Sequence, residues 1–312
     1  MVLWLVLRDQ DFDMLKEKIL GASFGILIFS RVFTFIAAIV RAARWQLLIK
    51  PLGQSPTLLH TFYAIMVGYL FNMGLPRMGE FFRCWSLQKT DNIAIDKLLG
   101  TVVAERLIDV LVLLCIVVFV FFSRFALVRD YFQEIVFTPL LRKLDAQLQD
   151  PLWLIVGIIV LLSLTLIGLF LLRKLAKGSF GQKVLKMISG FKDGLVSIWH
   201  MKEKLQFLGY TFGMWFCYLL AAFTAFFAFS ETAALKFVDG ILVLALGGIG
   251  MAAPVQGGLG AYHGAVSQGL ILLGINAEEA AAFAILVHGA MTAFVILAGV
   301  FSLFMVWRKT KS

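Results

Sequence analysis

Charged residues are scarce in this sequence. Only 15% of its 312 residues are Asp, Glu, Lys or Arg, and 61% are hydrophobic, whereas a soluble domain has about 25% charged and about 45–50% apolar residues. This scarcity excludes an ordinary water-facing surface. The apolar residues form nearly uncharged runs at 152–172, 207–229 and 280–307, and each run is long enough to cross a hydrocarbon core about 30 Å thick. The sequence therefore predicts an integral membrane protein.

Cysteine pairs and recognised catalytic motifs are also missing. Cys84, Cys115 and Cys217 form no C-x-x-C pair and share no ligand spacing with the histidines, so neither a disulfide framework nor a metal site is indicated. We find no P-loop, dinucleotide fingerprint or Ser/His/Asp set, so we predict no cofactor and no enzymatic activity. A net charge of +9 without any nucleic-acid motif indicates loops that face anionic lipid rather than nucleic acid.

Simple spans are expected at 22–42, 98–122, 152–172, 206–230 and 278–306. Two further apolar segments, 58–90 and 238–275, are interrupted by Gly and Pro at 74–79 and 254–260. Each half of the second segment has about 15 residues and would reach only about 22 Å as a helix, which is shorter than the bilayer. We therefore expect two re-entrant hairpins made of broken helices.

The loops that carry Lys and Arg predict the orientation. The segment 173–206 and the C-terminal tail are rich in both residues, so we place both on the cytoplasmic side. Counting crossings from the tail, the first hairpin enters from the cytoplasm and the second from outside. This topology puts 18 Lys and Arg residues in cytoplasmic segments and 8 outside, a bias that supports it.

The resulting order predicts an all-α polytopic bundle with an inverted repeat. Segments 22–122 and 206–306 are each predicted to form a span, a hairpin and a second span. The second set is inverted in the membrane relative to the first, as in many secondary transporters. Between them, 123–205 is expected to hold a linker span and a basic amphipathic cytoplasmic helix, which either grips anionic lipid or serves as a plain linker. We treat 1–312 as one membrane domain. Residues 8–20 would lie outside only if a helix preceded them, so we expect the native start upstream of Met1.

Charged side chains are costly inside a membrane, so those in the predicted spans and hairpins should face the protein interior. They are Arg31, Arg77, Glu80, Arg83, Glu105, Arg106 and Asp109. One hypothesis is that the arginines bind a lipid phosphate while the acids hold them in place. The alternative is a buried ion-pair network that fixes the first hairpin to its neighbours.

Two other groups of residues are candidates for binding. Gly257, Gly258 and Gly260 could bring backbone N–H groups to a phosphate at a helix start, or could simply form a tight turn. His263, like His288, could relay protons or make a packing hydrogen bond. Outside the spans, Asp9, Asp11 and Asp13 would suit a metal-dependent transferase, but they are typical of the start of a short interfacial helix.

Four motifs together resemble the flippase-like membrane domain of lysylphosphatidylglycerol synthases and their stand-alone relatives. They are RAARW at 41–45, NMGLPRMGEFFR at 72–83, ERLID at 105–109 and PVQGGLG at 254–260. The resemblance spans nearly the whole chain and implies a prokaryotic membrane protein that translocates or handles a lipid. Its signature positions would be Arg77, Gly79, Glu80, Arg83, Glu105, Arg106 and Asp109. His263 stands where relatives commonly have Glu, and no aminoacyl-transferase domain follows Ser312, so lysyl transfer is not expected.

Taken together, we expect a multi-pass transporter of the cytoplasmic membrane that moves a phospholipid or a polyprenyl-linked precursor. Relatives are also associated with hopanoids, so the cargo stays open. Two alternatives remain: a membrane-embedded glycosyl or lipid transferase that uses the N-terminal aspartates, and a non-transporting scaffold for a lipid-synthesis enzyme. The expected partners are membrane lipids, with a lipid-synthesis enzyme as the partner in the scaffold alternative, and nucleic acid is not expected.

Overall fold

The computed structural model describes residues 12–124, 138 and 201–311. The chain divides into two compact units, residues 1–120 with 201–312 and residues 121–200, and the account below concerns the first. Several predicted features lie outside the described residues: the span at 152–172, most of the basic helix at 181–204, Asp9 and Asp11. Asp13 lies in the first turn of α2 (Phe12–Gly21), where the helix dipole favours an acid.

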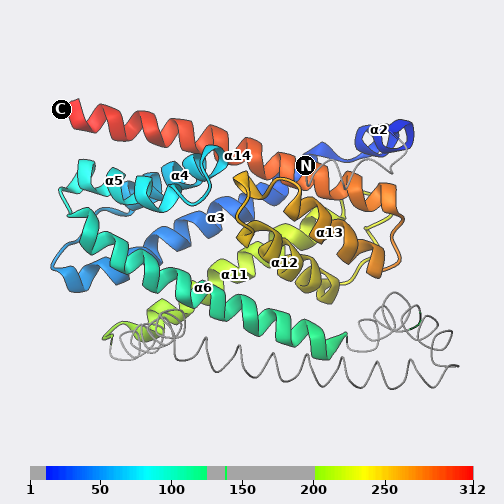
Figure 1. Ribbon diagram of the computed structural model, residues 1–312, viewed down its shortest axis with the longest axis horizontal. Helices are drawn as coiled ribbons and strands as arrows, with labels where there is room; N and C mark the ends of the chain where they lie inside the picture. Colours follow the sequence, from blue (N-terminus) through cyan, green and yellow to red (C-terminus); the bar gives the residue numbers. More distant parts are fainter. Residues whose placement is uncertain (1–11, 125–137, 139–200, 312) are drawn as a thin grey trace, which may run out of the picture. The chain divides into compact units, whose positions relative to one another are not determined.

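In the described residues, all regular elements are helices (Figure 1). Four helices are long and apolar enough to cross a membrane, and they confirm the polytopic all-α prediction. They are α3 (Phe24–Ile49), α6 (Ile95–Ser123), α11 (Lys204–Phe226) and α14 (Ala277–Lys311). Many of their large apolar side chains are exposed, such as Leu297 at 74% and Phe212 at 72%. Such faces suit contact with lipid rather than water.

The first interrupted segment forms a helical hairpin of α4 (Leu58–Gly74) and α5 (Gly79–Asp91). Leu75, which precedes Pro76, is extended at φ −127° and ψ 109°, because a following proline disfavours the helical conformation. The two arms approach closely where Gly68 faces Gly79: a Cβ at Gly79 would lie 2.0 Å from the carbonyl oxygen of Gly68. Only glycine at this position permits so tight a crossing.

The second interrupted segment also forms a helical hairpin, α12 (Phe237–Ala252) and α13 (Ala261–Leu272), joined through η3 (Gln256–Gly258). Ala253 before Pro254 leaves the helical region at ψ 145°, for the same steric reason. The two hairpin tips lie against each other, since a Cβ at Gly257 would lie 3.6 Å from the Cα of Met73 at the end of α4. Whether the hairpins are re-entrant stays a prediction.

Helix α14 holds the two hairpins together. In Figure 1, α4 and α5 lie beside its C-terminal half and α13 lies beside its N-terminal half. A Cβ at Gly299 would lie 2.7 Å from that of Leu70 in α4, so a small residue permits this crossing, as is common between membrane helices. At the other end, the Ser267 hydroxyl of α13 donates to the carbonyl oxygen of Ala280.

The end of the first predicted span is wrong. We expected it to end at 42 and counted Arg41 and Arg44 as cytoplasmic, but α3 continues to Ile49 and both arginines are buried within it. Arg83, also counted as cytoplasmic, is 2% exposed. Without these three arginines, 15 of the 18 Lys and Arg residues remain on the predicted cytoplasmic side, against 8 outside. The excess of Lys and Arg on the predicted cytoplasmic side therefore remains. It is smaller than first counted, because three of the arginines are paired inside the protein.

Candidate functional site

A cluster of ion pairs lies where α3, α5 and α6 meet, and its centre is Glu105. Arg41 and Arg44 project from α3 three residues apart, so they share a face, and they meet the two acids that α6 presents four residues apart. Arg41 Nη2 lies 2.6 Å from Glu105 Oε1 and 2.9 Å from Asp109 Oδ2. Arg44 Nη2 lies 3.2 Å from Glu105 Oε1 and 2.8 Å from Asp109 Oδ1. Glu105 and Arg44 are fully buried.

The first hairpin joins this cluster through Arg83. Its Nη2 donates to Glu105 Oε2 at 2.6 Å, and its guanidinium lies 4.1 Å from the ring centroid of Trp45. The Trp45 indole N–H in turn donates to the Thr101 hydroxyl of α6 at 2.9 Å. Because a guanidinium stacks well on an indole face, Arg83 is held from both sides. We conclude that it fixes α5 to α3 and α6.

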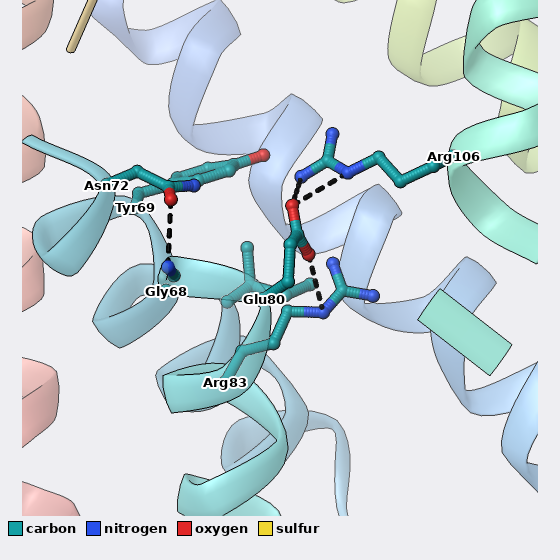
Figure 2. Close-up of a pocket in the computed structure, with 8 residues that line it drawn as sticks. Gly68, Tyr69, Asn72, Glu80, Arg83 and Arg106 are labelled. Carbon is teal, nitrogen blue, oxygen red and sulfur yellow. Dashed lines mark hydrogen bonds and ion pairs between the residues drawn. The ribbon is translucent and has the colours of Figure 1, made fainter. Parts of the chain in front are cut away.

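A second, more exposed pair borders the cluster (Figure 2). Glu80, in the first turn of α5, accepts from Arg106 Nε at 2.8 Å and also from Arg106 Nη2. Its other carboxylate oxygen, Oε2, lies 3.6 Å from Arg83 Nε. The Arg106 side chain is 39% exposed and that of Glu80 is 25% exposed. Figure 2 shows the Glu80 carboxylate between the two guanidinium groups, so it connects the buried cluster to the surface.

The seven charged side chains do not balance. Four arginines (Arg41, Arg44, Arg83 and Arg106) face three acids (Glu80, Glu105 and Asp109), which leaves one excess positive charge if all are ionised. Some hydrogen-bonding capacity is also unused, since the Nε atoms of Arg41 and Arg44 are buried and have no hydrogen-bond partner in the described part of the chain. An arginine-rich cluster with one surplus charge can accept a monoanion such as a phosphodiester.

The pocket at Glu80 and Arg106 is closed in this structure. It is lined by Ile65, Gly68, Tyr69, Asn72, Gly79, Glu80, Arg83 and Arg106. The side chains leave no room for a water molecule. Asn72 Oδ1 accepts the N–H of Gly79 at 2.8 Å and so ties the start of α5 to α4.

Two predicted site residues lie away from this cluster. Arg77 lies at the exposed tip of the first hairpin at φ 65°, and it forms no ion pair with any residue that the structure describes. A bulky residue with positive φ is uncommon and is a feature to test for function. Among the residues that the structure describes, Arg31 donates only to the hydroxyl of its neighbour Ser30, at 2.9 and 3.1 Å. The expectation that Arg31 would meet Glu80, Arg83 and the α6 charges is wrong.

The glycines of the second break do adopt unusual backbone conformations, with φ of 54° at Gly257, 77° at Gly258 and 81° at Gly260. Histidines hold this turn from within. The buried His263 accepts the N–H of Gly260 at its Nδ1 atom, and His288 Nε2 lies 2.8 Å from the carbonyl oxygen of Gly257. Because an amide N–H only donates and a carbonyl only accepts, both contacts fit neutral histidines. These contacts favour the interpretation as a packed turn.

Sequence reasoning missed three members of the cluster: Arg41, Arg44 and Trp45. A signal was present, because R-x-x-R-W puts these side chains on one helical face and Glu105 and Asp109 form a complementary pair four residues apart. The predicted span ended at 42, however, so the arginines were read as loop residues that follow the positive-inside rule. Charge alone does not separate a buried arginine near a helix end from a cytoplasmic one.

Comparison with known proteins supports a membrane function. A family model described as lysylphosphatidylglycerol synthase TM region matches residues 1–299. The UPF0104 membrane protein MJ1595 of Methanocaldococcus jannaschii is 28% identical over 111 residues, which cover 35% of this chain and 33% of that protein. The match therefore spans about a third of the relative. No solved structure matches the chain.

Proposed function

We propose, on the premise that the chain belongs to the lysylphosphatidylglycerol synthase TM region family, that it moves a lipid with an anionic headgroup between the leaflets of the cytoplasmic membrane. The cargo would be a phospholipid or a polyprenyl-linked precursor. The observation that carries this proposal is the Glu80–Arg106 pair, which is partly exposed and borders a buried cluster with one excess positive charge. In this proposal the C-terminus of the chain is cytoplasmic.

The surroundings of Arg106 suit a lipid rather than a soluble anion. Val103 and Val110 lie three residues before and four residues after it on α6, so all three share one face. The two valine side chains are 59% and 60% exposed. A headgroup phosphate could therefore meet the guanidinium while the acyl chains stay in contact with the apolar face of α6.

Arg106 would act by exchanging one anion for another. A guanidinium binds carboxylate and phosphate through the same pair of parallel hydrogen bonds, so a phosphate can replace Glu80 without leaving the arginine unpaired. Glu80 keeps Arg83 Nε as a partner while Arg106 is engaged.

The test is leaflet exchange of fluorescent phospholipids and polyprenyl phosphates in proteoliposomes. Arg106→Gln should reduce exchange at least about tenfold, because a charge-assisted bidentate contact contributes about 1.5–3 kcal/mol. Glu80→Gln should also reduce it, since Arg106 would lose the anion that returns it to the closed state. Lys97→Gln, an exposed substitution in α6, is the matched control and should leave exchange unchanged.

Wild-type protein that melts cooperatively yet exchanges no lipid in the panel would contradict the proposal. Co-purification of a lipid-synthesis enzyme with such a protein would instead favour a scaffold. The transferase alternative depends on Asp9, Asp11 and Asp13, and Asp13 is the one that the structure describes. If Asp13→Ala abolished turnover of a lipid-linked sugar while Arg106→Gln did not, the chain would be a transferase.

A further inference from the structure

A cleft separates α5 from the C-terminal part of α14, away from the charged cluster. Its lining comes from Trp85 and Lys89 on α5 and from Val300, Leu303, Phe304, Val306, Trp307 and Thr310 on α14. The two α5 residues are four apart, so they share one face of that helix. Most of the α14 residues recur at helical spacing and form one apolar stripe opposite them. The cleft therefore has two walls that run along the helices.

The cleft is open and of ligand size. Its free volume is about 530 Å³, within the range of about 300–1,000 Å³ typical of small-molecule sites. The pocket at Glu80, in contrast, holds no water-sized space. Phe304 and Trp307 are 53% and 52% exposed, so the apolar wall faces outward on a helix that is expected to cross the membrane.

Charge and aromatic residues mark one end of the cleft. Lys89 and Thr310 line it, and the basic residues Arg308, Lys309 and Lys311 end α14 beside them. The Lys311 ammonium lies 4.1 Å from the ring centroid of Trp307. Tryptophan and basic side chains together are typical of the level of lipid headgroups. The lining includes one cation and no acid, so it complements a negative charge.

A relay of polar contacts fixes this end of the cleft. His60 at the start of α4 lies 2.9 Å from Asp91 Oδ1 through its Nδ1 atom, and its Nε2 atom lies 2.9 Å from Lys309 Nζ. An ammonium only donates, so His60 accepts from Lys309 and donates to Asp91. These contacts hold the end of α14 near the hairpin. Lys89 is exposed and forms no ion pair with any residue that the structure describes.

We propose that this cleft binds one anionic phospholipid of the bilayer, with an acyl chain along Val300, Leu303 and Phe304 and the headgroup phosphate at Lys89. A second copy of the chain fits poorly, because it would bring the same basic cluster of α14 against itself. The site does not depend on lipid movement through Arg106. In this proposal the lipid stays bound between α5 and α14, on the surface of the first hairpin.

The test is native mass spectrometry of the purified full chain titrated with phosphatidylglycerol and, separately, with phosphatidylcholine. We expect one phosphatidylglycerol to bind preferentially. Leu303→Trp should fill the apolar wall, and Lys89→Gln should remove the phosphate partner, and each should weaken binding about tenfold. The matched controls are Leu297→Trp, which adds the same side chain at a 74% exposed position of α14 outside the cleft, and Lys97→Gln.

Each outcome decides the proposal. Phosphatidylglycerol binding that is unchanged in both variants, or reduced equally by Leu297→Trp, would overturn the site. Equal binding of phosphatidylcholine would overturn the requirement for an anion, and a dimer that Leu303→Trp dissociates, without a bound lipid, would make a second chain the occupant. Thermal melting of every variant excludes misfolding. Arg106→Gln should bind phosphatidylglycerol normally, so failure of this proposal is distinguishable from failure of lipid exchange.

Discussion

At the scale of single residues, the charged cluster pairs several of the few charged side chains of this chain with one another in the protein interior. Glu105 is fully buried and forms ion pairs with three arginines on two helices. Burying an ion is expensive unless it is paired and hydrogen-bonded. The Glu105 carboxylate therefore compensates the burial of the arginines, and the arginines compensate the burial of Glu105. Removal of one central partner would leave several buried charges uncompensated.

Glu105→Gln should strongly destabilise the protein. The amide keeps the shape of the side chain but leaves Arg41, Arg44 and Arg83 without their shared anion, and breaking a buried ion pair in this way costs about 3–5 kcal/mol. The measurement is thermal melting of the purified protein in detergent. Asp96→Asn, an exposed substitution in the first turn of α6, is the control and should lower the melting temperature far less, because it loses only a helix-dipole contribution of about 0.3–1 kcal/mol. An equal loss of melting temperature in both variants would contradict the structural role of Glu105.

A second residue-scale prediction concerns the contact of Lys18 with Glu231 and Glu279. Lys18 Nζ lies 2.6 Å from Glu231 Oε1 and 2.9 Å from Glu279 Oε1. The hydrogen bond to Glu231 raises the pKa of Lys18, and the hydrogen bond from Lys18 lowers the pKa of Glu231 below its ordinary value of 4.5. The Glu231 contribution to stability is therefore present above pH 4.5 and disappears as the pH falls through the lowered pKa.

Lys18→Met should accordingly melt at a lower temperature than the wild type at neutral pH. The difference should shrink as the pH falls below 4.5, because protonated Glu231 no longer attracts Lys18. Lys16→Met, at an exposed position of the same helix, should show no such pH dependence. The measurement is melting of the three proteins across the acid range, and a difference that stays constant over that range would argue against the contact.

At the scale of elements, the first hairpin is defined by a glycine contact as much as by its proline. Pro76 ends α4, but the angle at which α5 returns depends on Gly68 and Gly79. A side chain at either position would collide with the backbone or with a side chain of the opposite arm. The close approach places Glu80, which follows Gly79 directly, and Arg83, one helical turn after Gly79, against α6.

Gly79→Ala should therefore separate the arms of the hairpin. Its Cβ would lie 2.0 Å from the Gly68 carbonyl oxygen and 2.5 Å from Asn72 Cγ, and overpacking of this kind costs about 1–3 kcal/mol. We expect a lower melting temperature together with reduced lipid exchange. Gly74→Ala in the same hairpin meets nothing within 4 Å and is the control. Similar behaviour of the two variants would show that the close approach is not required.

At the scale of the whole molecule, the order of elements agrees with the predicted repeat. A long helix, a hairpin and a long helix occur as α3, α4–α5 and α6, and again as α11, α12–α13 and α14. The inverted orientation of the second set stays a prediction, because it depends on which side of a membrane each loop faces. The segment between the sets lies in the part of the chain that the structure leaves undescribed.

The topology predicts opposite accessibility for two positions. Leu59→Cys, at a 55% exposed site, should be labelled by an impermeant maleimide from the cytoplasmic side. Asn276→Cys, in the exposed turn before α14, should be labelled from outside. Both substitutions are made in a chain in which Cys115 and Cys217 are replaced by Ala, because a maleimide could reach these two native cysteines. Cys84 can stay, because it is buried. Labelling of both sites from one side would rule out an inverted pair of hairpins.

Local rules account for much of what the sequence predicted. Long apolar runs indicated four helices that the structure contains, and Pro76 and Pro254 marked the two breaks, because apolar length and proline sterics act within a few residues. Family motifs indicated Glu80, Arg83, Glu105, Arg106 and Asp109 as important positions. These features need no knowledge of which helix lies beside which.

The pairing inside the cluster required the tertiary structure. That Arg41 and Arg44 meet Glu105 and Asp109, while Arg31 stays with Ser30, depends on where α3 ends and which of its faces packs on α6. An arginine has the same charge in a cytoplasmic loop and in a buried cluster, and the cost of burial depends on the partners that packing brings within about 4 Å. The sequence by itself determined a helical membrane protein with two broken hairpins, and helix packing decided which charges became a site.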